Sequence, residues 1–218
     1  MLPRLSRTAA PLSTARIRGF YDWIGRRHDW AERYEGQAKA RALQALDLAA
    51  DQRVLDVGAG TGLEHRAIVR AIGRGGSAVA VDLSPVMLCL VRQRTGSPVA
   101  NADARRLPFT DGAFDRVFCG YVLDLLPEGD LARTMEEFAR VTTPGGRIAL
   151  VSMTQGRSPV SRLVVGAWKA LYRANPIWCG GCRPPDLSSL ARGLGLRVEM
   201  SERIEQLGFP SEVLVIRI

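Results

Sequence analysis

A glycine-rich turn that directly follows a short apolar run constrains this chain more than any other feature of its sequence. Residues 54–57 are Val-Leu-Asp-Val, and Gly-Ala-Gly-Thr-Gly follows at residues 58–62. Glycines at alternate positions allow the chain to turn sharply after a strand and allow a ligand to approach the backbone. A helix is expected after the turn, up to residue 72, and its amino end favours a negatively charged group. The segment therefore predicts a strand, a ligand-binding turn and a helix.

Strands and helices alternate along the rest of the chain. The periodicity predicts a strand over 78–82, then a helix with Ser84 as N-cap and Pro85 at its first position. Further strands are expected over 98–101, 116–119 and 147–152, with a helix over 131–141, and a final hairpin is expected over 197–204 and 212–218. This order predicts an α/β, Rossmann-like fold: a mainly parallel twisted sheet with helices on both faces and an antiparallel C-terminal edge strand.

The length of 218 residues favours one domain with a sizeable core. Residues 1–19 contain four arginines and no acidic residue, a composition that organelle transit peptides share with disordered bacterial tails. We expect a flexible tail over 1–19 and a single domain over 20–218. Within that domain, residues 158–185 are expected to form an insertion that covers the substrate.

Charge gives a weak indication of partners. The formal net charge is +8, but the basic residues are almost all arginine and are scattered along the chain. We therefore expect no nucleic-acid partner. No stretch is apolar enough to span a membrane, so the expected location is the cytoplasm, with peripheral membrane contact left open.

The four cysteines form no obvious framework. Cys89 and Cys119 lie in apolar patterns, where a free cysteine behaves as a small buried hydrophobe. Cys179 and Cys182 enclose two glycines, but a zinc site would need two more ligands and both histidines lie far away in the sequence. We expect no metal and favour a glycine-rich turn over a redox pair.

An acidic residue, Asp82, ends the second predicted strand, 20 residues after Gly62. A carboxylate in that position can accept hydrogen bonds from both ribose hydroxyls of an adenosine. The turn and the acid together indicate a ribose-bearing cofactor. They are compatible with both a nicotinamide dinucleotide and S-adenosylmethionine.

Three further motifs separate these two cofactors. Asn-Ala-Asp-Ala-Arg-Arg-Leu-Pro-Phe at 101–109, Asp-Gly-Ala-Phe-Asp at 111–115 and Pro-Gly-Gly-Arg at 144–147 follow in order. With them, roughly residues 53–152 resemble the class I S-adenosylmethionine-dependent methyltransferases. The small-molecule members are the most similar, such as the ubiquinone/menaquinone biosynthesis methyltransferases and the soluble phosphatidylethanolamine N-methyltransferases. A dinucleotide dehydrogenase has no reason to carry these motifs.

The resemblance implies S-adenosylmethionine as cofactor and assigns residues to it. The glycine turn shapes the methionine pocket, the acid at the second strand end holds the ribose, and the 101–109 segment reads the adenine. The implied cofactor-binding residues are Asp56, Gly58, Ala59, Gly60, Gly62, Asp82, Leu83, Met87, Asp103, Ala104, Cys119 and Gly120.

In-line methyl transfer requires no obligatory catalytic triad. The sulfonium donor already carries a good leaving group, so the protein mainly positions the two reactants and excludes water. A base helps where the nucleophile is a phenol or an enolic carbon. We name Tyr21, Tyr121 and Asp124 as catalytic candidates, with His28 as a further candidate base. Many relatives have histidines or asparagine where this chain has Asp124.

The acceptor must be bound by segments outside the cofactor motifs. Tyr21 belongs to a segment that resembles a lid helix of these families. The insertion predicts a helix with a broad apolar surface and a narrow basic face, and we expect Trp168 and Trp178 to contact substrate. Burial of that surface against the sheet edge is the alternative.

The sequence therefore predicts an enzyme, a methyltransferase acting on a small lipophilic acceptor such as a quinone precursor, a lipid or a phenolic metabolite. The alternative is a methyltransferase-like subunit that binds S-adenosylmethionine without catalysis. A nucleotide-dependent oxidoreductase ranks third. An RNA methyltransferase is disfavoured, because no RNA-binding module is evident.

Overall fold

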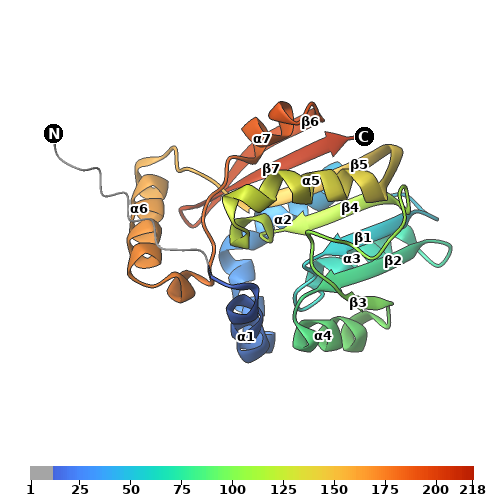
Figure 1. Ribbon diagram of the computed structural model, residues 1–218, viewed down its shortest axis with the longest axis horizontal. Helices are drawn as coiled ribbons and strands as arrows, with labels where there is room; N and C mark the ends of the chain where they lie inside the picture. Colours follow the sequence, from blue (N-terminus) through green and yellow to red (C-terminus); the bar gives the residue numbers. More distant parts are fainter. Residues whose placement is uncertain (1–11) are drawn as a thin grey trace.

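Seven strands form one sheet through the centre of the molecule in the computed structural model, which describes residues 12–218 (Figure 1). In chain order the strands are β1 (Arg53–Val57), β2 (Ser77–Asp82), β3 (Val99–Asn101), β4 (Phe114–Gly120), β5 (Thr142–Met153), β6 (Arg197–Gln206) and β7 (Phe209–Arg217). They lie in the order β3-β2-β1-β4-β5-β7-β6. The first five are parallel, and β7 is antiparallel to both of its neighbours. The predicted Rossmann-like α/β fold is confirmed.

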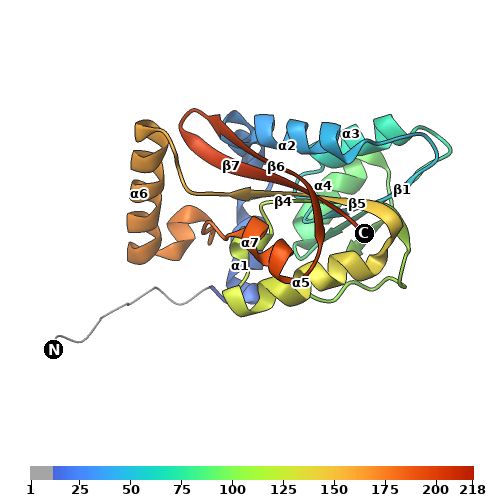
Figure 2. The same ribbon diagram turned by 90° about the horizontal axis from the view of Figure 1, so that it is seen from above.

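Helices cover both faces of this sheet. They are α1 (Thr14–Ile24), α2 (Glu32–Leu46), α3 (Leu63–Ile72), α4 (Pro85–Thr95), α5 (Glu128–Val141), α6 (Pro159–Ala174) and α7 (Leu187–Gly193), with 3₁₀ helices η1 (Gly25–Ala31), η2 (Leu123–Leu125) and η3 (Pro176–Cys179). Figure 2 shows α2 and α3 on one face and α5 and α7 on the other, while α6 stands beside one end of the sheet. None of the helices within residues 12–218 combines the length and the apolar character needed to cross a membrane.

The strands are buried on both faces because successive side chains point to opposite sides. Val54 packs with Leu46 and Ile68 under α2 and α3, whereas Leu55 packs with Phe138 under α5. A parallel strand with both faces covered reads as a continuous apolar run, which explains the sequence pattern. Carboxyl ends of β1, β2 and β4 therefore meet at one edge of the sheet.

The predicted start of α4 is confirmed. The Ser84 hydroxyl accepts a hydrogen bond from the Met87 amide, and Pro85 occupies the first turn. This cap fixes the direction of the chain immediately after Asp82. The acid at the end of β2 is thereby held beside the glycine turn.

The predicted antiparallel C-terminal edge hairpin is confirmed. The last strand, β7, is antiparallel yet lies inside the sheet between β5 and β6, so the edge strand is β6. Side chains along β7 are buried on both faces, whereas those of β6 alternate between exposed and half-buried. The chain places its more apolar strand in the interior.

The predicted tail over 1–19 needs correction at its C-terminal end. Helix α1 begins at Thr14, with Ser13 as N-cap, and Ile17 is buried. The part of that prediction covering residues 1–11 lies outside the described residues. Contacts of Ile17 with the rest of the molecule explain why the helix starts earlier than composition alone indicates.

Candidate functional site

A cavity of about 1100 Å³, counting its open mouth, lies at the carboxyl edge of β1, β2 and β4. Of the twelve predicted cofactor residues, nine line it: Asp56, Gly58, Ala59, Gly60, Asp82, Leu83, Asp103, Ala104 and Gly120. Gly62, Met87 and Cys119 lie outside its wall. The fold thus brings most of the predicted site together, from segments up to 64 residues apart.

The three glycines of the turn have different roles. All three have positive φ, between 52° and 84°. A Cβ added at Gly58 would lie 2.0 Å from Val122 Cγ2, and one at Gly62 would lie 3.1 Å from the Val91 Cα. These two glycines therefore permit close packing of the turn. At Gly60 an added Cβ would meet only His28, at 3.7 Å, so this glycine leaves its side open to the cavity.

Asp82 is half-buried at the end of β2 and holds the turn in place. Its carboxylate accepts hydrogen bonds from the Gly60 amide at 3.0 Å and the Ser84 amide at 2.8 Å. Burial raises its pKa to about 6, although both amides oppose that shift. The carboxylate is ionised at neutral pH and has further lone pairs available to a ligand.

Asp103 is paired within its own segment. Arg105 donates to both of its oxygens, at 2.9 Å and 2.5 Å. Burial would raise the pKa of Asp103, but the bonds and charge of Arg105 hold it below its usual value. Asp103 still lines the cavity, beside Leu83 and Ala104.

Two residues predicted to contact the cofactor are buried behind the wall. Met87 lies on the buried face of α4, and Cys119 is buried within β4. Burial raises the pKa of the Cys119 thiol, so that it remains a neutral apolar group. Each supports the wall from behind instead of facing the cavity.

Asp56 lies at the base of the cavity, where only 1% of its surface is exposed. Its Oδ2 lies 3.2 Å from His65 Nδ1. The other ring nitrogen of His65 is buried and has no hydrogen-bond partner among the described residues. The imidazole therefore packs below the carboxylate and orients it toward the cavity.

Residues of α1 and η1 cover the cavity. Tyr21 and His28 line it and contact each other edge to face, with ring centroids 5.4 Å apart. Burial raises the pKa of Tyr21 and lowers that of His28 to about 4. Both side chains are therefore neutral near pH 7. Tyr21 lies in α1, and its role in a lid over the cofactor stays a prediction.

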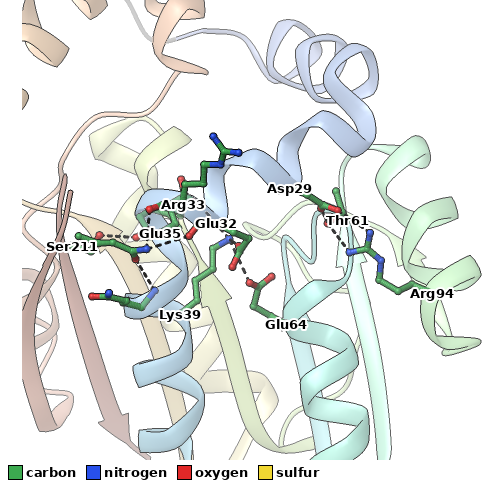
Figure 3. A network of polar contacts seen from close by, with 12 residues as sticks. Asp29, Glu32, Arg33, Glu35, Lys39, Thr61, Glu64, Arg94 and Ser211 are labelled. Atoms are coloured by element: carbon green, nitrogen blue, oxygen red, sulfur yellow. Dashed lines mark hydrogen bonds and ion pairs between the residues drawn. The ribbon is translucent and has the colours of Figure 1, made fainter. Parts of the chain in front are cut away.

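Polar contacts tie this covering segment to the cofactor side (Figure 3). Asp29 of η1 accepts a hydrogen bond from Thr61 of the glycine turn and pairs with Arg94 of α4 at 2.9 Å. Burial alone would raise the pKa of Asp29, but the bonds from Thr61 and Arg94 hold it below its usual value. Ser84 also donates to Asp22 of α1, at 2.5 Å. The cover is thus anchored at two points around the turn.

An ion cluster also lines the cavity, close enough to His28 of the cover for their charges to interact (Figure 3). Lys39 Nζ lies 2.5 Å from Glu32, 3.2 Å from Glu35 and 3.4 Å from Glu64. It also lies 5.9 Å from the centre of the Tyr121 ring. Glu64 comes from the first turn of α3 and the other three from α2, so the cluster joins two helices across the cavity wall.

Two predicted catalytic residues behave differently from the prediction. Tyr121 lines the cavity, but its hydroxyl lies 2.6 Å from Ser211 Oγ, and burial raises its pKa. Asp124 is outside the cavity and fully buried, where it accepts hydrogen bonds from Ser152 Oγ at 2.6 Å and the Met153 amide at 2.9 Å. Burial raises the pKa of Asp124 to about 7. Asp124 therefore holds η2 against β5, and its side chain does not line the cavity.

The predicted substrate contacts of the 158–185 insertion are not found at the cavity. Trp168 packs on Phe209, with ring centroids 5.6 Å apart, and its indole donates to the Cys182 carbonyl at 3.0 Å. Trp178 is 65% exposed. Only Cys182 of the insertion lines the cavity, next to Tyr21. The apolar face of α6 turns partly toward β7 and partly toward solvent.

All four cysteines are free thiols. Across residues 12–218 there is no group of three or more histidine, cysteine or acidic side chains that could hold a metal ion. Cys179 and Cys182 enclose a tight turn in which Gly180 and Gly181 both have positive φ. An added Cβ at Gly180 would contact Phe20 and Tyr21, so the turn allows close packing against α1.

Sequence reasoning missed the ion cluster and the contacts that anchor the cover. One signal was available: Lys39 is one of only two lysines in the chain, and Glu32, Glu35 and Lys39 fall on one helical face. Glu64 gave no signal, because an acid in the first turn of a helix usually complements the helix dipole.

The family model described as "Methyltransferase domain" matches residues 55–150. A demethylmenaquinone methyltransferase of Mycolicibacterium vanbaalenii is 31% identical over 204 residues, which cover 88% of this chain and 86% of the relative. A demethylmenaquinone methyltransferase of Parafrankia is 34% identical over 199 residues, covering 79% and 75%.

Solved structures show the same fold. A methyltransferase in complex with the Haloferax volcanii Trm112 activator superposes with a TM-score of 0.72 at 20% identity, covering 92% of this chain and 96% of that one. The Burkholderia thailandensis 1,6-didemethyltoxoflavin-N1-methyltransferase, with 1,6-didemethyltoxoflavin and S-adenosylhomocysteine bound, superposes with a TM-score of 0.68 at 18% identity, covering 95% of this chain and 92% of that one.

Proposed function

The chain belongs to the class I S-adenosylmethionine-dependent methyltransferases, and from this membership we propose that it methylates a small lipophilic acceptor of the quinone-precursor, lipid or phenolic class. One observation carries the acceptor class: the cavity wall beyond the glycine turn is apolar. Ile17, Phe118, Val122, Leu125 and Leu126 form it. The names of the two relatives, both demethylmenaquinone methyltransferases, support the same class.

The residues of the cavity suit S-adenosylmethionine. The open side of Gly60 leaves space against the backbone, and the ionised Asp82 offers acceptors for two ribose hydroxyls. We propose that Leu83 and Ala104 contact the adenine and that Asp56 lies toward the methionine amino group. When bound, the cofactor supplies a methyl group on a positively charged sulfur.

The protein contributes mainly by positioning the two reactants. Tyr21 and His28 cover the cavity, and we propose that their side chains exclude water from it. Both side chains are neutral near pH 7, so they add no charge beside the reactants. Holding the nucleophile about 3 Å from the methyl carbon, in line with the bond that breaks, lowers the entropic part of the barrier. Cys182 extends the cover from the insertion, so we propose that residues 158–185 close the acceptor end through this turn.

A membrane-facing role of the insertion also has support. Val160, Leu163 and Trp178 are exposed apolar side chains of α6 and η3, and the α6 residues Arg162, Lys169 and Arg173 add positive charge. We propose contact with an anionic membrane surface. Sedimentation with phosphatidylglycerol vesicles should retain the wild-type chain and lose Leu163→Glu. Equal retention of the two would exclude this surface.

A screen with methyl-labelled S-adenosylmethionine tests the proposed function. Quinone-precursor, lipid and small-phenol pools are incubated separately with the protein, and labelled organic-soluble product is separated by chromatography. Product from one of these pools is expected. Label only in water-soluble amines or thiols would contradict the acceptor class. A subunit that binds the cofactor without catalysis would label no pool, and nothing in the comparisons supports that alternative.

A further inference from the structure

We infer that Glu64 takes the proton from the acceptor's hydroxyl group and that Lys39, Glu32 and Glu35 position its carboxylate for this step. The inference rests on the proposed function, because it requires an acceptor whose nucleophile carries, or is conjugated to, a hydroxyl. It assigns a catalytic role to a residue that no cofactor motif includes.

The cluster borders the methionine end of the cavity, beyond the adenine and ribose, because Glu64 follows the glycine turn and lies close enough to Asp56 for their charges to interact. Adenine and ribose are assigned to the ends of β2 and β3, whereas Glu64, Lys39 and Tyr121 join α3, α2 and the end of β4. The apolar wall formed by Phe118 and Val122 borders the same side. An acceptor that fills this space therefore has carboxylate oxygens within reach.

The charges of the cluster do not balance. One ammonium group faces three carboxylates at distances up to 3.4 Å. A buried carboxylate without a cationic partner is costly, so it tends to hold a proton or to face a group that donates one. This imbalance makes one member of the cluster available as a proton acceptor.

Among the three carboxylates, Glu64 lies farthest from the Lys39 ammonium group. Glu32 is the nearest to the ammonium and half-exposed, and Glu35 lies 3.2 Å from it on the same helix. Glu64 is the farthest, at 3.4 Å, and comes from the helix that follows the glycine turn. It has the most remaining capacity to accept a hydrogen bond from an acceptor.

Protonation favours the same residue. Burial raises the pKa of Glu64 to about 7, Lys39 opposes this shift, and Glu32 and Asp56 add to it. Burial also raises the pKa of Glu35. Burial alone would lower the pKa of Lys39, but its three glutamate neighbours raise it by more, so Lys39 stays positively charged. A base works best when its pKa lies near the working pH.

The other titratable groups around the cavity suit this role less well. Burial raises the pKa values of Tyr21, Tyr121 and Cys182, so these groups remain protonated near pH 7. His28 is neutral but lies over Gly60 in the cover. Asp82 is assigned to the ribose.

The proposed step is a proton transfer coupled to methyl transfer. The acceptor O–H bond breaks, the proton moves to a Glu64 carboxylate oxygen, and the electron pair stays on the acceptor. A bond forms from that oxygen, or from the ring carbon conjugated to it, to the methyl carbon. The carbon–sulfur bond breaks and its electron pair remains on sulfur, which becomes neutral. Glu64 then releases its proton to water. Where carbon is methylated, the proton of that carbon passes through solvent to the oxygen and restores the hydroxyl.

The experiment measures kcat against pH at saturating donor and acceptor, with the acceptor found in the screen. For the wild type, kcat should fall as the pH is lowered through about 7. Glu64→Gln should lower kcat at pH 8 by about 100-fold or more and remove this pH dependence. Glu32→Gln should shift it to lower pH, because a negative neighbour of Glu64 is lost. This shift needs only an intact Glu64, so it tests the inference even if Glu64→Gln fails to fold.

The matched control is Glu202→Gln. Glu202 pairs with Arg41 of the same helix α2, but outside the cavity, so both kcat and its pH dependence should remain unchanged. Binding of S-adenosylhomocysteine, followed by calorimetry, is measured on every variant. Affinity within about twofold of wild type is expected for Glu64→Gln, because the residue is assigned to the acceptor.

Three results would overturn the inference. The first is wild-type activity with the wild-type profile in Glu64→Gln. The second is an unshifted profile in Glu32→Gln. The third is a tenfold loss of S-adenosylhomocysteine affinity in Glu64→Gln with its kcat profile unchanged. The last result would place Glu64 at the donor's ammonium group. A wild-type chain that labels only a lipid amine would reject this inference and leave the proposed function standing, whereas a chain that labels none of the three pools would reject both.

Discussion

Thr61, inside the glycine-rich turn, donates a hydrogen bond to Asp29 of the covering segment, so the loop that forms the floor of the cavity also holds its cover. Arg94 of α4 binds both residues, at 2.9 Å from Asp29 and 3.2 Å from Thr61. Asp29 and Thr61 both line the cavity. Cover and floor are therefore coupled through three side chains.

Removing the arginine should speed cofactor exchange. Arg94→Met keeps the aliphatic stem but removes the bonds to Asp29 and Thr61, so we expect S-adenosylhomocysteine to dissociate about 3- to 10-fold faster, the effect of roughly 1 kcal/mol. Stopped-flow displacement measures this rate. Arg92→Met, on the same helix at an exposed position, is the control. Identical rates in the two variants would show that the contact does not restrain the cover.

Two glycines of the turn should respond differently to substitution. Gly60→Val should fold with reduced stability, because a φ of 52° is unfavourable for a branched residue, and it should bind no S-adenosylhomocysteine, because its side chain would extend into the cavity. Gly58→Val should lower the unfolding midpoint strongly, because its Cβ would overlap Val122. Calorimetry and thermal unfolding on both variants separate the effects. Cofactor binding by a folded Gly60→Val would refute the placement.

Asp82 should govern the pH dependence of cofactor binding. Its pKa of about 6 means that the carboxylate becomes protonated as the pH is lowered through that value, and it then loses its strength as an acceptor for ribose hydroxyls. We expect weaker S-adenosylhomocysteine binding below pH 6. Asp82→Ala should weaken binding several-fold at pH 7.5 and abolish the pH dependence. If Asp82 only caps the turn, thermal stability will drop while affinity stays the same.

Asp124 should affect stability and not catalysis. Its folded-state pKa, about 7, lies above the ordinary value of 3.8, so the folded protein binds the proton more tightly than the unfolded chain. Stability contributed by this group is therefore full below pH 4 and is lost as the pH rises to 7. Asp124→Asn should flatten this part of the stability curve, measured by denaturant unfolding at several pH values. A large fall in kcat with unchanged stability would restore Asp124 as a catalytic residue.

Trp168 should stabilise the insertion without contacting substrate. Trp168→Phe retains the packing on Phe209 and loses the bond to the Cys182 carbonyl, which should cost about 1 kcal/mol. Trp168→Ala should cost about 3 kcal/mol, because the packing is lost as well. Unfolding midpoints test both values. A rise in the acceptor's KM for Trp168→Phe with no loss of stability would argue for direct substrate contact.

Local patterns in the sequence were enough to predict the strands and the turn that carry the expected cofactor residues. Asp56, Gly60 and Asp82 belong to a strand, a turn and a second strand end, and their relative positions follow from the geometry of one βαβ unit. The N-cap at Ser84 is a local feature of the same kind. Short-range chemistry determines these positions, so a single sequence reveals them.

The acceptor half could not be predicted in the same way. The meeting of Lys39 with Glu64 depends on how α2 packs against α3, and the placement of Trp168 depends on how α6 stands against β7. A charged helical face usually points to solvent, and an apolar face gives no indication of which surface will cover it. These relationships arise only when distant segments pack together.

The internal position of β7 has a consequence for synthesis on the ribosome. Strand β6 pairs with no strand other than β7 among those described, and β5 lacks its second neighbour until β7 is made. While the chain grows, β5 therefore presents an unpaired apolar edge that a neighbouring nascent chain could occupy. Strand β6 is rich in charged residues, such as Glu202 and Arg203, and is therefore a poor substitute for β7 as the partner of β5 during that interval. The β5 edge therefore stays open to aggregation until β7, which ends at Arg217, has been made and has paired with it.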